Sequence, residues 1–150
     1  MTSSFVLRPV RVQDLDELYT MERAEFSSGS YPRFFFRQAL DALGDHFLVA
    51  TVDGALAGYI LGSMQTPSSD AWILSLLIAP SFRRKGLATR LIQELLQQFV
   101  VQGASCARIH VSPANQSAMT LYDRLGFREQ TYEEHYFGRG KGRWVLELSL

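Results

Sequence analysis

The chain has 150 residues, 47% of them hydrophobic and 20% charged, and 15 basic residues balance 15 acidic ones. These values are typical of a folded globular protein that is long enough to bury its own core, and they exclude a disordered chain. The net charge of zero disfavours nucleic acid as the main ligand, and no apolar run approaches the roughly 20 residues of a membrane span.

Two helices are predicted in the first half of the chain. The first begins at Gln13 or Asp14 and runs through Glu25, with Leu15 and Leu18 among the residues that face inward. The second covers Arg33–Leu43 and begins directly after a proline, which suits a helix start. Three consecutive phenylalanines, Phe34–Phe36, cannot all face one core on this helix. We therefore expect some of these rings to line a cleft or to cover a sheet edge.

Strands are predicted around these helices. Asp53-Gly54 is a strong hairpin signal between two apolar runs, and Gly58 in the second run permits a bulge or close packing. A polar turn, Thr66–Asp70, then leads into an almost wholly apolar run that suits a strand buried on both faces. The predicted strands are Phe5–Val10, His46–Thr51, Ala55–Gln65 and Ala71–Ile78.

The second half of the chain contains a long amphipathic helix that begins after Gly86 and ends at Gln102-Gly103. Its inward stripe is Leu87, Leu91, Leu95 and Phe99. A strand at Ala107–Val111, a short helix from Asn115 to Gly126, and a hairpin of Arg128–Phe137 with Trp144–Leu150 follow. This order predicts a single α+β domain, residues 1–150, with a mixed, mostly antiparallel sheet of about seven strands and about four helices.

A basic loop joins the apolar strand to the long helix and reads Arg83-Arg84-Lys85-Gly86-Leu87-Ala88-Thr89. The start of a helix has unpaired N–H groups and the positive end of the helix dipole, so this junction can bind an anion. Gly86 allows a ligand to approach the backbone closely, and Ala88 keeps the first helical turn small. The glycine patterns of nucleotide triphosphate and dinucleotide loops are absent. A solvated basic turn is the alternative.

Two motifs resemble those of the GNAT family of N-acetyltransferases. Arg83-x-x-Gly86-x-Ala88 is similar to the acetyl-CoA pyrophosphate motif of that family. The stretch from Asn115 through Ala118 and Tyr122 to Gly126-Phe127 resembles the second signature of the family, Asn-x-x-Ala…Tyr…Gly-Phe. The two motifs stand in the order and at the separation found in the family, and the resemblance covers roughly the whole chain.

The resemblance implies the GNAT fold and acetyl-CoA as cosubstrate. The sheet would splay between the strand ending near Ile78 and the strand Ile109–Val111, and the pantetheine of acyl-CoA would pair with the backbone in that notch. The backbone N–H groups of Arg84–Thr89 would hold the pyrophosphate, the Leu77 N–H would face the oxyanion, and Tyr122 would protonate the leaving thiolate. The implied cofactor-binding residues are Leu76, Leu77, Ile78, Arg83, Arg84, Lys85, Gly86, Leu87, Ala88, Thr89, Asn115 and Tyr122.

Within the family, the chain resembles the protein N-terminal acetyltransferases, including those that act on ribosomal proteins. This likeness implies that Tyr31 and Tyr136 bind the acceptor N-terminus and that His110 helps to deprotonate the amine. Strand alternation should turn His110 away from the apolar face of its two neighbours. The chain departs from this branch at Phe137, where a second tyrosine is common, and at His110, where many members have glutamate.

Other functions stay open on sequence alone. A small-molecule amine acetyltransferase, for a polyamine, amino acid or antibiotic, and a non-catalytic acyl-CoA-binding module are the alternatives. The three histidines, His46, His110 and His135, lack the spacing of metal ligands. The single cysteine, Cys106, should be a small buried residue and fits a reducing cytosol. We therefore expect a cytoplasmic monomer or homodimer that binds no metal, no nucleic acid and no membrane.

Overall fold

The structure, a computed structural model, describes residues 4–65 and 69–150, and these form two compact units. The first unit comprises the chain up to Gly62 together with Ser75–Leu95, and the second comprises Ser63–Leu74 and Leu96–Leu150. The helices are α1 (Leu15–Phe26), α2 (Arg33–Leu43), α3 (Leu87–Val101) and α4 (Gln116–Arg124). The strands are β1 (Phe5–Pro9), β2 (Phe47–Val52), β3 (Ala55–Met64), β4 (Asp70–Ile78), β5 (Cys106–Val111), β6 (Arg128–Glu133) and β7 (Arg143–Ser149).

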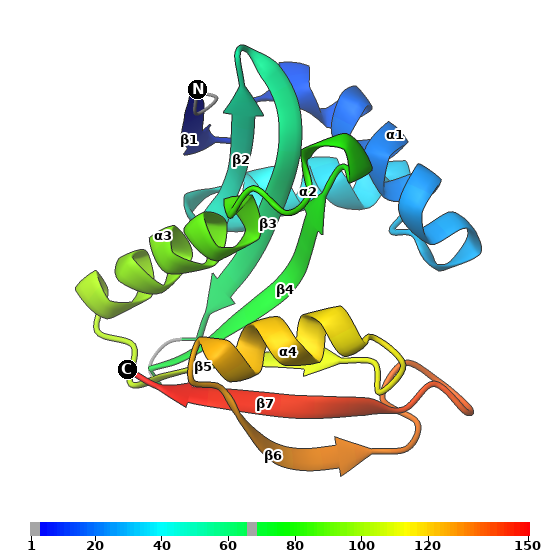
Figure 1. The fold of residues 1–150 in the computed structure, drawn as a ribbon, viewed down its shortest axis with the longest axis vertical. Coiled ribbons are helices and arrows are strands. Elements are labelled where there is room, and N and C mark those ends of the chain that lie inside the picture. The colour runs from blue at the N-terminus through cyan, green and yellow to red at the C-terminus, as the bar shows by residue number, and fades with distance from the viewer. Residues whose placement is uncertain (1–3, 66–68) are drawn as a thin grey trace. The chain divides into compact units, whose positions relative to one another are not determined.

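The strands are hydrogen-bonded in the order β1-β2-β3-β4-β5-β7-β6 (Figure 1). Pairs β1–β2, β2–β3, β5–β7 and β6–β7 are antiparallel, and β4 pairs with β5 in parallel from Asp70↔Cys106 to Ile73↔Ile109. The predicted α+β class, with seven strands and four helices, is confirmed. The predicted turn Thr66–Asp70 falls largely on residues 66–68, which lie outside the described residues.

In the first unit, α2 packs on β2 and on α1 (Figure 1). Its side chain Phe36 is only 1% exposed, whereas Phe34 is 65% exposed. The ring of Phe36 lies 6.4 Å from that of Phe47 and 5.7 Å from that of Tyr59, measured between centroids. The three phenylalanines thus diverge as predicted, because successive helix residues point in different directions.

The hairpin of β2 and β3 turns at Asp53 and Gly54, whose φ angles are 50° and 86°. Both positive angles suit a tight turn between antiparallel strands, so the predicted hairpin is confirmed. Further along β3, a Cβ added at Gly58 would lie 2.5 Å from the carbonyl oxygen of Leu77. Gly58 therefore marks a close approach of two backbones, which was one of its two predicted uses.

In the second unit, α4 runs alongside β5 and β7 (Figure 1). Arg108 on β5 forms ion pairs with Asp70 on β4 (2.7 Å) and Glu147 on β7 (2.9 Å), which link three neighbouring strands. The thiol of Cys106 is buried and donates to Asp70 Oδ1 at 3.3 Å, so Cys106 is the small buried residue that the sequence predicted. Burial raises the pKa of this thiol, which keeps it protonated.

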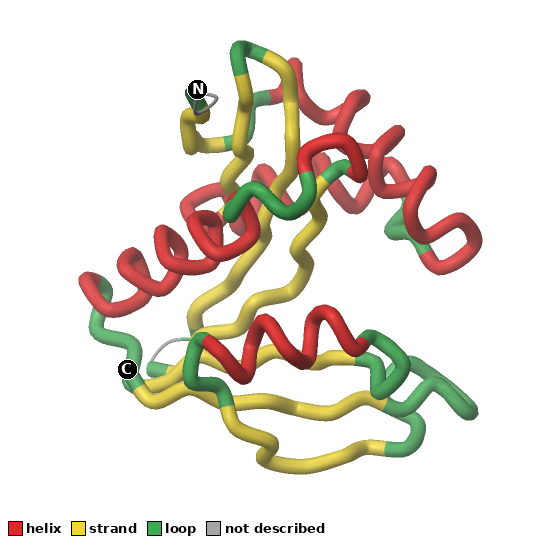
Figure 2. Tube along the Cα trace, in the orientation of Figure 1, coloured by secondary structure: helices red, strands yellow, loops and turns green. Residues whose placement is uncertain are grey.

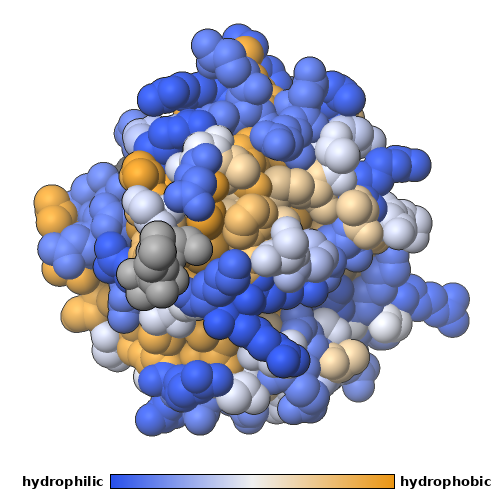
Figure 3. Space-filling model, turned by 45° about the horizontal axis from the view of Figure 1, so that its top comes forward, coloured by the Kyte–Doolittle hydropathy of each residue, from blue (hydrophilic) through white to orange (hydrophobic). Residues whose placement is uncertain are grey.

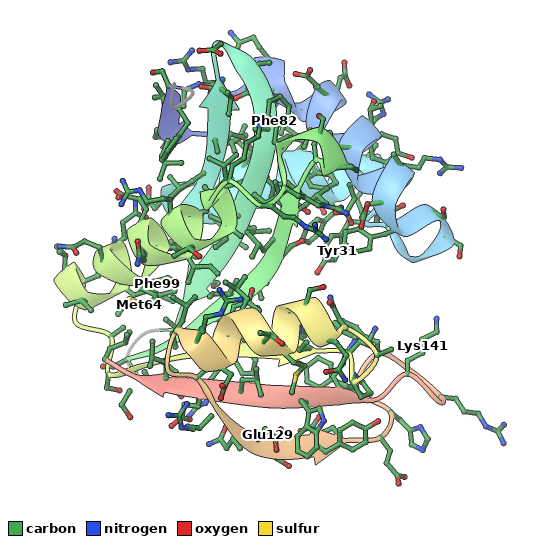
Figure 4. All side chains as sticks on the ribbon, viewed as in Figure 1. Tyr31, Met64, Phe82, Phe99, Glu129 and Lys141 are labelled. Carbon is green, nitrogen blue, oxygen red and sulfur yellow. The ribbon has the colours of Figure 1, made fainter. Side chains whose placement is uncertain are left out.

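The strand predicted at Arg128–Phe137 is four residues too long, because β6 ends at Glu133. The following residues form a compact turn, drawn as a green loop in Figure 2. In this turn the N–H of Gly138 donates to the carbonyl of His135 (3.0 Å), and the N–H of Phe137 donates to that of Lys141 (3.2 Å). Lys141 extends away from the ribbon (Figure 4). These local hydrogen bonds replace those of a strand ladder, so the aromatic residues of the turn leave the sheet.

Apolar side chains also reach the surface. Phe34, Val6 and Val101 are more than half exposed, and on the face drawn in Figure 3 hydrophobic and hydrophilic side chains are mixed. Such scattered exposure is ordinary for a folded domain.

Candidate functional site

In the first unit, the predicted anion-binding junction connects β4 to α3. After a short 3-10 turn at Pro80–Phe82, the backbone takes positive φ angles at Arg84 (63°) and Gly86 (81°). The first hydrogen bond into α3 runs from the N–H of Arg90 to the carbonyl of Gly86 (3.1 Å). The N–H groups of the preceding helical residues, 87–89, are therefore available to an external acceptor.

This junction fits a phosphate group. A Cβ added at Gly86 would have no described atom within 4 Å, so the backbone here faces open space. Arg84 and Lys85 are both exposed and add positive charge beside the N-terminus of α3. Backbone donors, the helix dipole and two cations together form the kind of site that binds phosphate oxygens.

The side chain of Arg83 has a structural role that the sequence did not predict. Its Nε donates to the carbonyl of Ile78 at 3.0 Å, and its guanidinium forms a 2.8 Å ion pair with Glu25 at the end of α1. The Arg83 side chain thus connects the end of β4 to the end of α1. The Arg83 side chain is still 43% exposed, so its charge is matched by Glu25 and not hidden from solvent.

Residues Leu76–Ile78 form the last part of β4, within the first unit. The side chains of Leu77 and Ile78 are buried, and the N–H of the next residue, Ala79, donates to the carbonyl of Ala57 at 2.8 Å. This bond fixes the end of the strand. The pairing of pantetheine with this backbone and the use of the Leu77 N–H at the oxyanion stay predictions.

Tyr31 follows α1 in the first unit and is labelled in Figure 4. Its ring stacks on that of Phe35, with centroids 4.3 Å apart, and its N–H donates to Glu22 Oε2 at 3.0 Å. Glu22 is only 2% exposed and also accepts the hydroxyl of Tyr59 at 2.7 Å. Sequence reasoning missed Glu22. The available signal was its spacing, since it stands three and four residues after inward-facing positions of α1.

The second unit contains His110, on β5 between the buried residues Ile109 and Val111. The predicted alternation is confirmed, because the His110 ring points instead toward two rings of the β6–β7 turn. It lies 5.0 Å from the ring of Tyr136, at right angles, and 4.6 Å from that of Phe137. The structure therefore brings two predicted site residues, His110 and Tyr136, into contact.

The imidazole of His110 is held neutral. Its Nδ1 is buried and has no hydrogen-bond partner among the residues that the structure describes. Burial lowers the pKa of His110 to about 4, and the positive charge of Arg143 adds to this effect. The guanidinium of Arg143 lies 4.9 Å above the ring of Phe137. The contacts of Phe137 and Arg143 with each other and with His110 were not predicted, because the predicted strand includes Phe137, which lies in the turn, and the predicted loop includes Arg143, which begins β7.

Tyr122 and Asn115 belong to α4 and the residue before it. Tyr122 is 2% exposed and meets the ring of Phe127 edge-on, with centroids 5.3 Å apart. Burial raises the pKa of Tyr122, so its phenol is protonated at neutral pH. The side-chain oxygen of Asn115 accepts the N–H of Ala118 at 3.1 Å. Asn115 is therefore the N-cap of α4.

No group of three or more His, Cys, Asp or Glu side chains that could hold a metal ion occurs within residues 4–65 and 69–150. Over the same residues, no helix has the length and apolarity needed to cross a membrane. A hollow of about 330 Å³ lies in the second unit, and its lining does not include His110 or Tyr122. It is lined by Met119, Asp123, Phe127, Arg128, Glu129 and Leu146.

Comparison with known proteins gives consistent matches. Residues 12–127 match the sequence model of the acetyltransferase (GNAT) family. An N-alpha-acetyltransferase of Sulfurisphaera tokodaii is 28% identical over 155 residues, which cover 96% of this chain and 92% of that protein. The ribosomal protein bS18-alanine N-acetyltransferase of Salmonella typhimurium is 28% identical over 130 residues, with 86% and 84% covered. Arabidopsis thaliana Naa50, solved with the bisubstrate analogue CoA-Ac-MVNAL, has the same fold, with a TM-score of 0.85, 20% identity, and 98% and 99% covered.

The pKa of His110 predicts a pH dependence of stability. Between about pH 6.5 and pH 4 the unfolded chain binds a proton at His110 that the folded protein does not, so the free energy of unfolding should fall as the pH drops through this window. His110→Gln should remove this part of the slope, and His135→Gln, at an exposed histidine, should leave it. Urea unfolding of the three proteins from pH 4 to pH 7 measures the effect. Parallel curves for wild type and His110→Gln would contradict it.

Proposed function

Because the chain belongs to the acetyltransferase (GNAT) family, we propose that it transfers the acetyl group of acetyl-CoA to the N-terminal α-amino group of a protein or peptide. The observation that carries this proposal is the neutral His110 imidazole, packed against Tyr136 and Phe137 with a buried, unpartnered Nδ1 among the described residues. The names of the similar proteins, an N-alpha-acetyltransferase and a ribosomal-protein alanine acetyltransferase, support the same class of acceptor.

Acetyl-CoA supplies an acyl group that is already activated as a thioester. We propose that its pyrophosphate is held by the backbone N–H groups of Arg84–Thr89, with the Thr89 hydroxyl as a further donor and the charges of Arg84 and Lys85 beside them. The available N–H groups at the start of α3 and the open space at Gly86 support this assignment. The backbone of Leu76–Ile78 and the side chain of Asn115 contact the pantetheine. The Leu77 N–H donates to the oxyanion.

Two side chains handle the protons. The attacking amine must lose a proton as its nitrogen bonds to the acetyl carbon, and His110 accepts it directly or through a water. With a pKa of about 4, His110 is neutral at pH 7 and ready to accept, although it is a weaker base than an ordinary histidine. As the carbon–sulfur bond breaks, Tyr122 donates its phenolic proton to the thiolate, and its raised pKa keeps that proton in place until then.

The low pKa of His110 also favours one kind of acceptor. An α-ammonium has a pKa of about 8, against about 10.4 for lysine, so a weak base deprotonates it at a lower cost. Tyr31 and Tyr136 supply aromatic surface for the first residues of the acceptor. We assign the reaction to one domain, residues 1–150, in the cytoplasm, where the free thiol of Cys106 stays reduced.

The acceptor is tested by incubating the protein with acetyl-CoA and a library of short peptides with varied first residues. Mass spectrometry should find acetylation on the α-amino group, with lysine side chains in the same peptides left free. Polyamines, free amino acids and aminoglycosides serve as competing acceptors. Rapid turnover of one of these small amines, with none of the peptides, would assign the protein to a different branch of acetyltransferases.

Gly86→Ala should weaken acetyl-CoA binding about tenfold or more, because a methyl group would occupy the space into which the backbone opens. Gly103→Ala is the matched control, since Gly103 also has a positive φ (89°) and open surroundings but lies at the other end of α3. Both variants should lose about 1 kcal/mol of stability from backbone strain. Calorimetric titration with acetyl-CoA measures the affinity of each variant. Equal affinities of Gly86→Ala and Gly103→Ala would show that the loop at Gly86 does not bind acetyl-CoA.

Tyr122→Phe should lower kcat about 100-fold, because the thiolate then leaves without a positioned acid. The affinity for acetyl-CoA should change little, since the ring still packs against Phe127. Tyr19→Phe, at a half-buried tyrosine of α1, is the control for loss of a hydroxyl. Single-turnover rates measure the chemical step itself. A Tyr122→Phe protein with the wild-type single-turnover rate would require another acid.

A further inference from the structure

Glu22 is a buried acid to which the proposed reaction gives no task. It is one of four buried polar or charged residues in the described chain, and only 2% of it is exposed. Asp14, another of the four, pairs with Arg8 at 2.7 Å. No ion pair to Glu22 occurs among the described residues, so its charge is compensated by hydrogen bonds instead. A buried carboxylate depends strongly on such donors.

The two oxygens of Glu22 hold different parts of the first unit. Oε1 accepts the hydroxyl of Tyr59 on β3 at 2.7 Å, and Oε2 accepts the backbone N–H of Tyr31 at 3.0 Å. Since the Tyr59 hydroxyl donates to Glu22, the hydroxyl of Ser75 on β4 donates in turn to the Tyr59 oxygen, at 2.7 Å. Burial and the nearby Glu22 raise the pKa of Tyr59, so it keeps its proton and its direction of donation.

The bond to Tyr31 connects the segment Ser27–Tyr31 to the middle of α1. α1 ends at Phe26, and Ser27 takes an unusual positive φ of 46°. Within the next turn, the N–H and the hydroxyl of Ser30 both donate to the carbonyl of Ser27, at 3.2 Å and 2.8 Å. These bonds close the segment on itself. The bond from Tyr31 to Glu22 joins the far end of the segment to the interior of α1.

We propose that Glu22 is a positioning residue that holds the segment Ser27–Tyr31 in place for the acceptor by accepting the Tyr31 N–H. The proposal rests on the function proposed above, in which Tyr31 contacts the acceptor N-terminus. Moving the segment away would leave a buried carboxylate oxygen without its donor, which is costly. The acceptor therefore meets a surface already ordered before binding, and this lowers the entropy cost of binding it.

Two substitutions distinguish a positioning role of Glu22 from a role in accepting a proton. In Glu22→Gln the amide oxygen can still accept the Tyr31 N–H, while the amide nitrogen donates to Tyr59 and the Tyr59 hydroxyl turns to Ser75. In Glu22→Asp the charge is kept, but the side chain is one methylene shorter and cannot reach both Tyr59 and Tyr31. A positioning role of Glu22 thus predicts that Glu22→Gln behaves like wild type and that Glu22→Asp does not.

The experiment measures peptide acetylation by wild type, Glu22→Gln and Glu22→Asp, with Glu17→Gln and Glu17→Asp as exposed controls on α1. Glu22→Asp should raise KM for the peptide about tenfold and leave KM for acetyl-CoA within about twofold. Glu22→Gln and both controls should stay within about twofold for both substrates. If Glu22→Gln instead loses kcat with an unchanged peptide KM, Glu22 accepts a proton through Ser75 and Tyr59, and the positioning role is wrong.

Hydrogen exchange of the Tyr31 amide tests the same bond without any acceptor, and thus independently of the proposed function. Exchange should be faster in Glu22→Asp than in wild type and unchanged in Glu22→Gln. Equal exchange in all three proteins would overturn the proposal, even if peptides are acetylated normally. Inactivity of wild type toward every peptide, combined with the expected exchange pattern, would instead reject the proposed acceptor and keep the role of Glu22 in ordering the segment.

Discussion

A carboxylate shielded from solvent needs hydrogen-bond donors, and in the first unit this requirement at Glu22 connects four parts of the chain. The acid belongs to α1, and its donors come from the segment after that helix and from β3. The Tyr59 hydroxyl extends the group to Ser75 on β4, while the Tyr59 ring packs against Phe36 and Phe47. Tyr59 thus supplies both a hydroxyl that donates to Glu22 and a ring that packs in the apolar core. The placement of the segment that carries Tyr31 therefore depends on the core of the unit.

In the second unit, His110, the proposed base, lies in the opposite kind of environment. His110 is buried against two rings, and its Nδ1 lacks a partner among the described residues, so nothing there stabilises the charged imidazolium. Burial then selects the neutral form, as it selects the protonated phenol of Tyr122. Each oxygen of Glu22 accepts a hydrogen bond, whereas the buried Nδ1 of His110 has no partner among the described residues. The first arrangement suits positioning and the second suits proton transfer.

The helices and strands could largely be predicted, because burial imposes a period on each and the turns carry glycine. The limits of α2 agree with the prediction, and β6 fails only where hydrogen bonds between His135, Gly138 and Lys141 close a turn. The polar contacts could not be predicted in the same way. Glu22 and Tyr59 are 37 positions apart in the sequence, so the residues around one do not indicate that it bonds to the other. The low pKa of His110 likewise depends on rings that only the folded turn brings to it.

Arg83 is the first basic residue of the loop proposed to bind pyrophosphate; its charge is matched by Glu25, and its Nε donates to the carbonyl of Ile78. The cationic field at the junction therefore comes from Arg84 and Lys85, and the remaining attraction comes from uncharged N–H groups. Dissolved salt screens exposed cations strongly but affects hydrogen bonds made at close range much less. Binding of a polyphosphate here should consequently persist at ionic strengths that would release it from a loop relying on three free cations.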